Sequence, residues 1–175
     1  MQDDAAGDPS PTLLIAGLVI AVTAIGAILA IAATRQTPQP PVAIAAVPAP
    51  QANSPECQAL LATLPDQLGD LKRAAAVEPV PGGTAAWRNA GEPVIMRCGL
   101  DRPTEFVVGS PIQMVDDVGW FRLADTGLAR STWVSVDRPV YVALTLPDGS
   151  GPTPIQALSE VIGRTMPAIP IRPGG

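Results

Sequence analysis

The sequence predicts an α+β fold behind one N-terminal transmembrane helix. Residues 12–33 form an uncharged apolar run, whereas helical periodicity recurs later only in short segments near residues 54–64 and 153–162. Between residues 94 and 146 the chain shows the alternation of antiparallel strands. We therefore expect a small antiparallel sheet, with helices at the start and end of the domain packed on one face.

Residues 12–33 form the predicted transmembrane helix. As a helix this run would be about 33 Å long, enough to cross a hydrocarbon core of about 30 Å. A secretory signal has a basic start and a shorter apolar run, whereas this chain begins with the acidic segment Met1–Asp4. Cleavage at the small-residue segment Ala43–Ala45 stays open as an alternative.

A proline- and alanine-rich stretch follows the predicted helix. Residues 34–55 contain six prolines, and such a segment cannot build a core and favours an extended chain. We expect it to be an extracytoplasmic linker that holds a domain of residues 56–166 away from the membrane. Residues 1–11 then form a cytoplasmic tail, and residues 167–175, rich in proline and glycine, form a disordered C-terminal tail.

The first helix of the predicted domain has sequence signals at both ends. Ser54 is a favourable N-cap, and Pro55 suits the first helical position. Pro65 stops the helix near Leu64. Cys57 shares one apolar face with the leucines of this segment, so it is expected to be buried.

The second cysteine is also expected on a buried face. Cys98 lies in the alternating segment 94–100, on the same face as Val94 and Met96. We predict that Cys57 and Cys98 form a disulfide that joins the first helix to this strand. Buried free thiols and a redox pair are the alternatives, although the spacing lacks the Cys-x-x-Cys pattern of catalytic dithiols.

The predicted disulfide decides the expected orientation in the membrane. By the positive-inside rule, Arg35 would place the chain after the helix in the cytoplasm. One charge contributes little to that rule, whereas a disulfide requires an oxidising compartment. We therefore expect a single-pass plasma-membrane protein with a cytoplasmic N-terminus and an extracytoplasmic C-terminal domain.

Two hairpins are predicted in the middle of the chain. An Asp-Asp-Val-Gly turn separates residues 112–115 from 120–123, and Asp-Arg-Pro separates residues 131–136 from 140–146. Each pair of short alternating segments around a turn predicts two antiparallel strands. The closing helix begins at Thr153 or the proline after it.

The composition excludes several classes of chemistry. The chain has no histidine, so Ser-His-Asp and Cys-His mechanisms are impossible within it. It is acidic, with a net charge of −5, and its basic residues are scattered, so nucleic-acid binding is not expected. The pair Asp116–Asp117 is interpreted as a turn, because adjacent strand residues point to opposite faces. We predict no catalytic residues, no cofactor and no metal site.

Aromatic side chains offer the clearest recognition chemistry. Trp120 and Phe121 are neighbours in a predicted strand, so one of them faces away from the core unless a loop covers it. An exposed aromatic side chain can anchor a partner, which makes these two residues candidate partner contacts. The alternative is that the predicted loop 66–91 covers the outward-facing ring.

Three functional hypotheses remain open. The first is a non-catalytic accessory or protein-binding module of the cell envelope, carried at a set distance from the membrane. The second is a pocket for a lipid or cell-wall fragment, lined by Trp87, Trp120 and Tyr141. The third is a carboxylate-dependent hydrolase that uses acidic residues remote in sequence. Its candidate carboxylates are Glu92, Asp101, Glu105 and Asp125.

Several stretches of the chain resemble a family of actinobacterial, including mycobacterial, secreted or membrane-anchored proteins known as a domain of unknown function. The most specific are Arg97-Cys-Gly99 and Asp137-Arg-Pro-Val-Tyr-Val142, supported by Cys57–Pro65 and Val118-Gly-Trp120. The resemblance covers the apolar segment and most of the domain. It implies a location in the cell envelope and supplies no catalytic residues.

Overall fold

The computed structural model describes residues 11–34, 39–123, 127 and 129–175. The chain divides into two compact units, residues 1–38 and 39–175. In the first unit, helix α1 (Pro11–Thr34) confirms the predicted apolar helix. It is long and apolar enough to cross a membrane, and an N-terminal signal sequence shares these properties.

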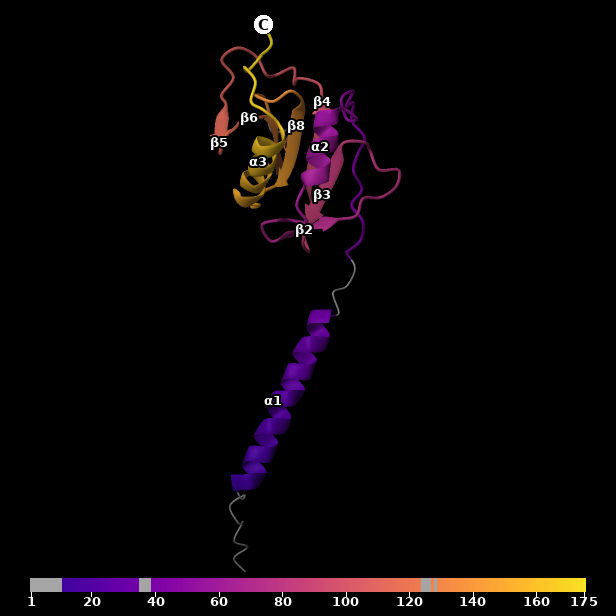
Figure 1. Ribbon diagram of the computed structural model, residues 1–175, viewed down its shortest axis with the longest axis vertical. Helices are drawn as coiled ribbons and strands as arrows, with labels where there is room; N and C mark the ends of the chain where they lie inside the picture. The colour runs from indigo at the N-terminus through magenta and orange to yellow at the C-terminus, as the bar shows by residue number, and fades with distance from the viewer. Residues whose placement is uncertain (1–10, 35–38, 124–126, 128) are drawn as a thin grey trace, which may run out of the picture. The chain divides into compact units, whose positions relative to one another are not determined.

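The second unit is built on an open antiparallel sheet. Its strands follow the order β1-β2-β3-β4-β8-β7-β6-β5, so β4 and β8 lie at the centre (Figure 1). In chain order they are β1 (Gln67–Leu68), β2 (Leu71–Ala74), β3 (Thr84–Arg88), β4 (Val94–Leu100), β5 (Gln113–Val115), β6 (Val118–Arg122), β7 (Arg130–Ser135) and β8 (Tyr141–Pro147). The two predicted hairpins are confirmed as β5–β6 and β7–β8.

Two helices pack on one face of this sheet, as predicted. Helix α2 (Pro55–Thr63) begins at the N-cap Ser54, whose hydroxyl accepts a hydrogen bond from the amide of Cys57. Helix α3 (Thr153–Thr165) lies beside α2 in front of the central strands (Figure 1). The α+β class expected from the sequence is therefore confirmed.

The main core lies between the helices and the sheet. Trp87 of β3 and Trp120 of β6 are fully buried there, and each indole N–H has a partner. Trp87 donates to the carbonyl of Pro65 at 3.0 Å, and Trp120 donates to the hydroxyl of Ser159 at 2.9 Å. Because both polar atoms are satisfied, these two large rings can fill the core without a desolvation cost.

The segment predicted as the loop 66–91 instead contributes three strands. β1, β2 and β3 all lie within it and extend the sheet beyond β4. The three central residues of β3, from Ala85 to Trp87, are all buried, because both faces of the strand are covered. A strand that is covered on both faces has no alternating pattern, so its sequence carries little strand signal.

Most of the predicted linker belongs to the folded unit. Residues 39–54, here called the N-terminal arm, run along the sheet beside β3 (Figure 1). The amide of Val42 donates to Ala75, and the Val42 carbonyl accepts from Val77. Val42 and Ile44 are buried against the sheet. Residues 39–54 of the predicted linker therefore belong to the folded unit, because extended backbone that cannot form its own core can still pair with a neighbouring strand.

The C-terminal segment also differs from its predicted disorder. The amide of Ile169 donates to the carbonyl of Asp137 at 2.9 Å. Gly174 donates to the carbonyl of Phe106 at 2.8 Å, and its own carbonyl accepts from Val108. Proline-rich composition excludes a regular ladder here but leaves enough amides for these separate contacts.

The predicted disulfide is present between Cys57 and Cys98. Both cysteines are fully buried, and their Cα atoms are 5.7 Å apart. The bond joins α2 to β4, the strand that pairs with β3 and β8. The two cysteines are 41 residues apart in the sequence, so the bond ties α2 to the centre of the sheet.

Gly99 allows the N-terminal arm to approach β4. Its φ is +87°, and a Cβ at this position would lie 2.2 Å from the carbonyl carbon of Gln51. The amide of Gln51 donates to the Gly99 carbonyl at 3.0 Å. The turn around Gln51 and Ala52 therefore packs directly on the backbone of β4, beside the disulfide.

Removal of the disulfide should lower the free energy of unfolding. For the loop closed here, the chain-entropy model gives a loss of about 4 kcal/mol for Cys57→Ala/Cys98→Ala. Urea denaturation followed by circular dichroism measures this difference. Wild-type protein treated with a reductant serves as the control and should show the same loss. Oxidised and reduced wild type with the same midpoint would contradict the prediction.

Gly99→Ala should destabilise the domain more than Gly109→Ala. Both glycines have nearly the same φ, +87° and +89°, but no atom lies within 4 Å of a Cβ built on Gly109. Gly109→Ala should therefore lose only about 1–2 kcal/mol of conformational strain, whereas Gly99→Ala adds about 1–3 kcal/mol of overpacking. Equal urea midpoints for the two variants would show that the arm does not pack on Gly99.

Candidate functional site

A groove crosses the face of the sheet that lies opposite α2 and α3. Within the part of the chain that the structure describes, this face is covered by segments without helices. The N-terminal arm covers β3 and part of β4, and Phe106 covers Phe121 of β6. Between the N-terminal arm and the segment that carries Phe106, part of the central strands faces a hollow. We call this hollow the sheet groove; its volume is about 570 Å³.

Two cross-strand rows form the floor of the sheet groove. In the first row, Arg97 of β4 lies opposite Ala143 of β8, which lies opposite Val134 of β7. Residues that are directly opposite in an antiparallel pair share one face, so these side chains lie side by side. The second row runs in the same way through Ile95, Thr145 and Thr132.

The sheet groove is mainly apolar, with a few polar groups. Ile95, Ala143 and Val134 are buried floor residues, and Val47 of the N-terminal arm forms part of one wall. The floor threonines satisfy each other through a hydroxyl–hydroxyl hydrogen bond of 3.0 Å. Exposed charged side chains also line the groove: Asp101, Glu105 and Arg130.

Arg97 is the charged residue of the groove floor. Its side chain is half-buried, and burial lowers the pKa of the Arg97 guanidinium below its ordinary value. One terminal nitrogen donates to the carbonyl of Ala45 at 3.4 Å, and the buried Nε atom has no hydrogen-bond partner. In the sequence, Arg97 is the one charged residue inside the apolar strand 94–100. A single charge within an apolar strand could have indicated this site, but Arg97 was not among the predicted site residues.

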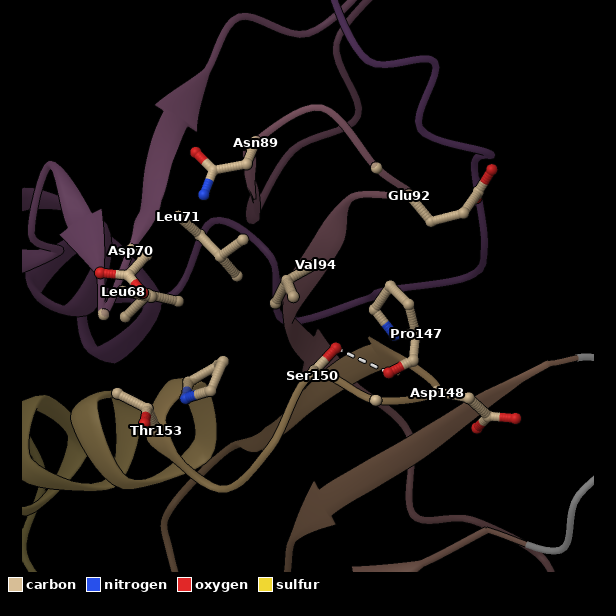
Figure 2. Close-up of a pocket in the computed structure, with 14 residues that line it drawn as sticks. Leu68, Asp70, Leu71, Asn89, Glu92, Val94, Pro147, Asp148, Ser150 and Thr153 are labelled. Atoms are coloured by element: carbon tan, nitrogen blue, oxygen red, sulfur yellow. Dashed lines mark hydrogen bonds between the residues drawn. The ribbon is translucent and has the colours of Figure 1, made fainter.

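A second hollow, here called the acidic cavity, lies between the β1–β2 end of the sheet and the loop before α3. Its volume is about 540 Å³, and its lining includes Asp70, Glu92 and Asp148 (Figure 2). Figure 2 shows Asp70 on the side away from Glu92 and Asp148, with its carboxylate pointing in the opposite direction from that of Asp148. Acid–base hydrolysis requires two carboxyl groups directed at one bond, and these side chains do not converge in that way.

The hydrolase hypothesis named four carboxylates, which the structure distributes over separate places. Glu92 lines the acidic cavity and forms an ion pair with Arg130 at 3.6 Å. Asp101 and Glu105 lie at the rim of the sheet groove, and Asp125 falls outside the described residues. Among the residues described, no group of three or more His, Cys, Asp or Glu side chains could hold a metal ion.

The two candidate partner contacts are both buried. Trp120 has no exposed surface and lies in the main core, and Phe121 is 6% exposed. The neighbours do point to opposite faces, but Phe106 covers Phe121, with ring centroids 5.1 Å apart. The covering segment is therefore the loop after β4, not residues 66–91, because the chain reverses over the second face of the sheet at that point.

The predicted aromatic pocket does not form as expected. Trp87 and Trp120 fill the core between helices and sheet, whereas Tyr141 packs with the cluster around Phe106 on the other face. Sheet topology places these rings on two sides of one layer, so they cannot line a common pocket. The open surface of the sheet is instead the groove around Arg97.

A buried ion pair lies beside the β7–β8 turn. Asp137 and Arg138 are 7% and 4% exposed, and their charged atoms are 2.9 Å apart. Asp137 accepts a hydrogen bond from the amide of Gly119 at 2.8 Å, and Arg138 donates to the carbonyl of Asp117 at 2.6 Å. The pair holds the two hairpin turns together, so the sequence prediction of simple turns missed a structural role.

The fold and its surface define a small disulfide-bonded α+β domain that follows an apolar helix and carries an open groove on its helix-free sheet face. The chain belongs to the family described as protein of unknown function (DUF3515), whose model matches residues 18–171. The match covers most of the apolar helix and nearly all of the folded unit. No curated protein and no solved structure matches the chain.

Loss of one partner of the buried ion pair should be costly. Asp137→Ala leaves the Arg138 charge buried and unpaired, which we expect to lower the free energy of unfolding by about 3–5 kcal/mol. In a double-mutant cycle, Asp137→Ala/Arg138→Ala should cost less than the sum of the two single variants. Urea denaturation measures each value.

The exposed ion pair between Glu160 and Arg164 provides the matched control for this cycle. Glu160→Ala should change the free energy of unfolding by only about 0.5 kcal/mol or less, because solvent screens an exposed pair. If Asp137→Ala costs no more than Glu160→Ala, the buried pair does not hold the hairpin turns together.

Proposed function

We propose that this protein is a membrane-anchored, non-catalytic binding module whose folded unit lies outside the cytoplasm and binds through the sheet groove. The observation that supports the proposal most is the groove itself, an open apolar floor on the central strands of the sheet. Its volume of about 570 Å³ falls in the range of small-molecule and peptide-side-chain sites.

The disulfide and the apolar helix support the proposed location. A buried disulfide that joins a helix to a central strand forms and persists in an oxidising compartment. Helix α1 is long enough to anchor the chain in the membrane on the N-terminal side of this unit. An N-terminus in the cytoplasm and a C-terminal unit outside it satisfy both features.

The chemistry of the two hollows supports the proposed binding role. The sheet groove contains the half-buried Arg97, the exposed Arg130, two hydrogen-bonded threonines and rim carboxylates that are exposed to solvent. The carboxylates of the acidic cavity diverge (Figure 2). Neither arrangement pairs an acid with a base over a common point, whereas an apolar floor with a few polar groups is typical of binding sites.

A photoreactive side chain in the groove should capture what binds there. Benzoylphenylalanine in place of Val47, in the groove wall, should give an adduct in living cells. The same substitution at Val77 should not, although both valines are 44% exposed. Mass spectrometry of the purified protein then separates small adducts from protein adducts. Equal labelling at both positions, or none at Val47, would sink the proposed binding role.

Alkaline phosphatase fused after Gly175 tests the location in the same strains. The enzyme requires an oxidising compartment, so an active fusion is the expected result. A fusion that is inactive while a cytoplasmic reporter at the same position is active would reverse the proposed orientation.

A further inference from the structure

Arg97 lies in the floor of the sheet groove and has no carboxylate partner in the described part of the chain, whereas three other arginines of the folded unit are paired. Arg138 is paired with Asp137, Arg130 with Glu92, and Arg164 with Glu160. Among the described residues, no carboxylate lies within 4 Å of the Arg97 guanidinium, whose one hydrogen bond is to a backbone carbonyl. A half-buried cation without a counter-ion is costly, and an arriving anion removes that cost.

The surroundings of Arg97 specify more than an anion. Along its cross-strand row, the next two side chains are the buried Ala143 and Val134, and Ile95 lies in the neighbouring row. A ligand held at Arg97 must therefore lay an apolar body over this floor. A guanidinium has several N–H donors in one plane, a geometry that suits a carboxylate.

The rim of the groove restricts the charge of the ligand. Asp101 and Glu105 are exposed at one end and repel a second negative charge. Arg130 also lines the groove, but its charge is already paired with Glu92. A carboxylate carries a single charge, whereas a phosphate monoester approaches two. The groove therefore favours a monoanionic amphiphile over a polyanion.

We infer that the sheet groove binds an amphiphile with one carboxylate, whose carboxylate pairs with Arg97 and whose apolar body covers Ala143 and Val134. This inference rests on the proposed function, because it takes the groove as the binding surface and names its occupant. The acidic cavity carries no comparable argument, since its carboxylates are exposed and no buried cation faces it.

Equilibrium dialysis with radiolabelled octanoate tests the inference on the full chain in phosphatidylcholine nanodiscs. Binding to empty nanodiscs is subtracted. Octanamide has the same chain without the charge, so it should compete about tenfold or more weakly than octanoate. This comparison uses the wild-type protein and needs no variant. Equal competition by octanoate and octanamide, or no saturable octanoate binding, would overturn the inference.

Arg97→Gln should weaken octanoate binding about tenfold or more, because it removes the counter-ion and keeps a polar side chain. Arg88→Gln is the matched control: Arg88 is also half-buried with an unpartnered Nε atom, but it lies outside the groove. Arg88→Gln should bind octanoate as wild type does. Equal losses in the two variants, or no loss in Arg97→Gln, would refute the role of Arg97.

Ala143→Leu provides a second variant if Arg97→Gln does not fold. The larger side chain occupies the groove floor, so it should weaken octanoate and octanamide by similar factors while Arg97 stays in place. Unchanged binding in this variant would place the ligand elsewhere. An adduct captured at Val47 without any octanoate binding would refute the carboxylate ligand and leave the binding role of the groove standing.

Discussion

The disulfide between Cys57 and Cys98 is the constraint on which most of the fold depends. It fixes α2 against β4, and β4 pairs with β3 on one side and β8 on the other. Helix α2 is short, and it packs on α3 and in the main core through Cys57 and Leu60. The covalent bond adds to this packing by limiting the freedom of the unfolded chain.

The two neighbours of Cys98 in β4 shape the second face of the sheet. Gly99 admits the turn around Gln51, which brings the N-terminal arm onto the sheet, and Arg97 lies on the face that the arm partly covers. One short stretch of β4 therefore contributes the disulfide, the docking point of the arm and the charged floor of the groove. The helix-packed face provides stability, and the face with the arm and the loop provides the open surface.

Local patterns explain why part of this fold could be predicted. The N-cap Ser54 and the proline after it mark the start of α2, and the alternation of residues 94–100 marks β4. The strands β1 to β3 were missed because β3 is buried on both faces and the other two are short. The arm and the C-terminal segment were missed because proline-rich sequence has no periodicity, although its remaining amides and carbonyls can still pair.

The sequence by itself determined the apolar helix, the α+β class and the pairing of the two cysteines, because each depends on spacing along the chain. The tertiary structure alone decided which side chains meet. It buried Trp120 and Phe121 on opposite sides of one sheet and left Arg97 without a carboxylate in an open groove. Exposure and charge pairing depend on how distant segments cover a sheet, and no local pattern encodes that covering.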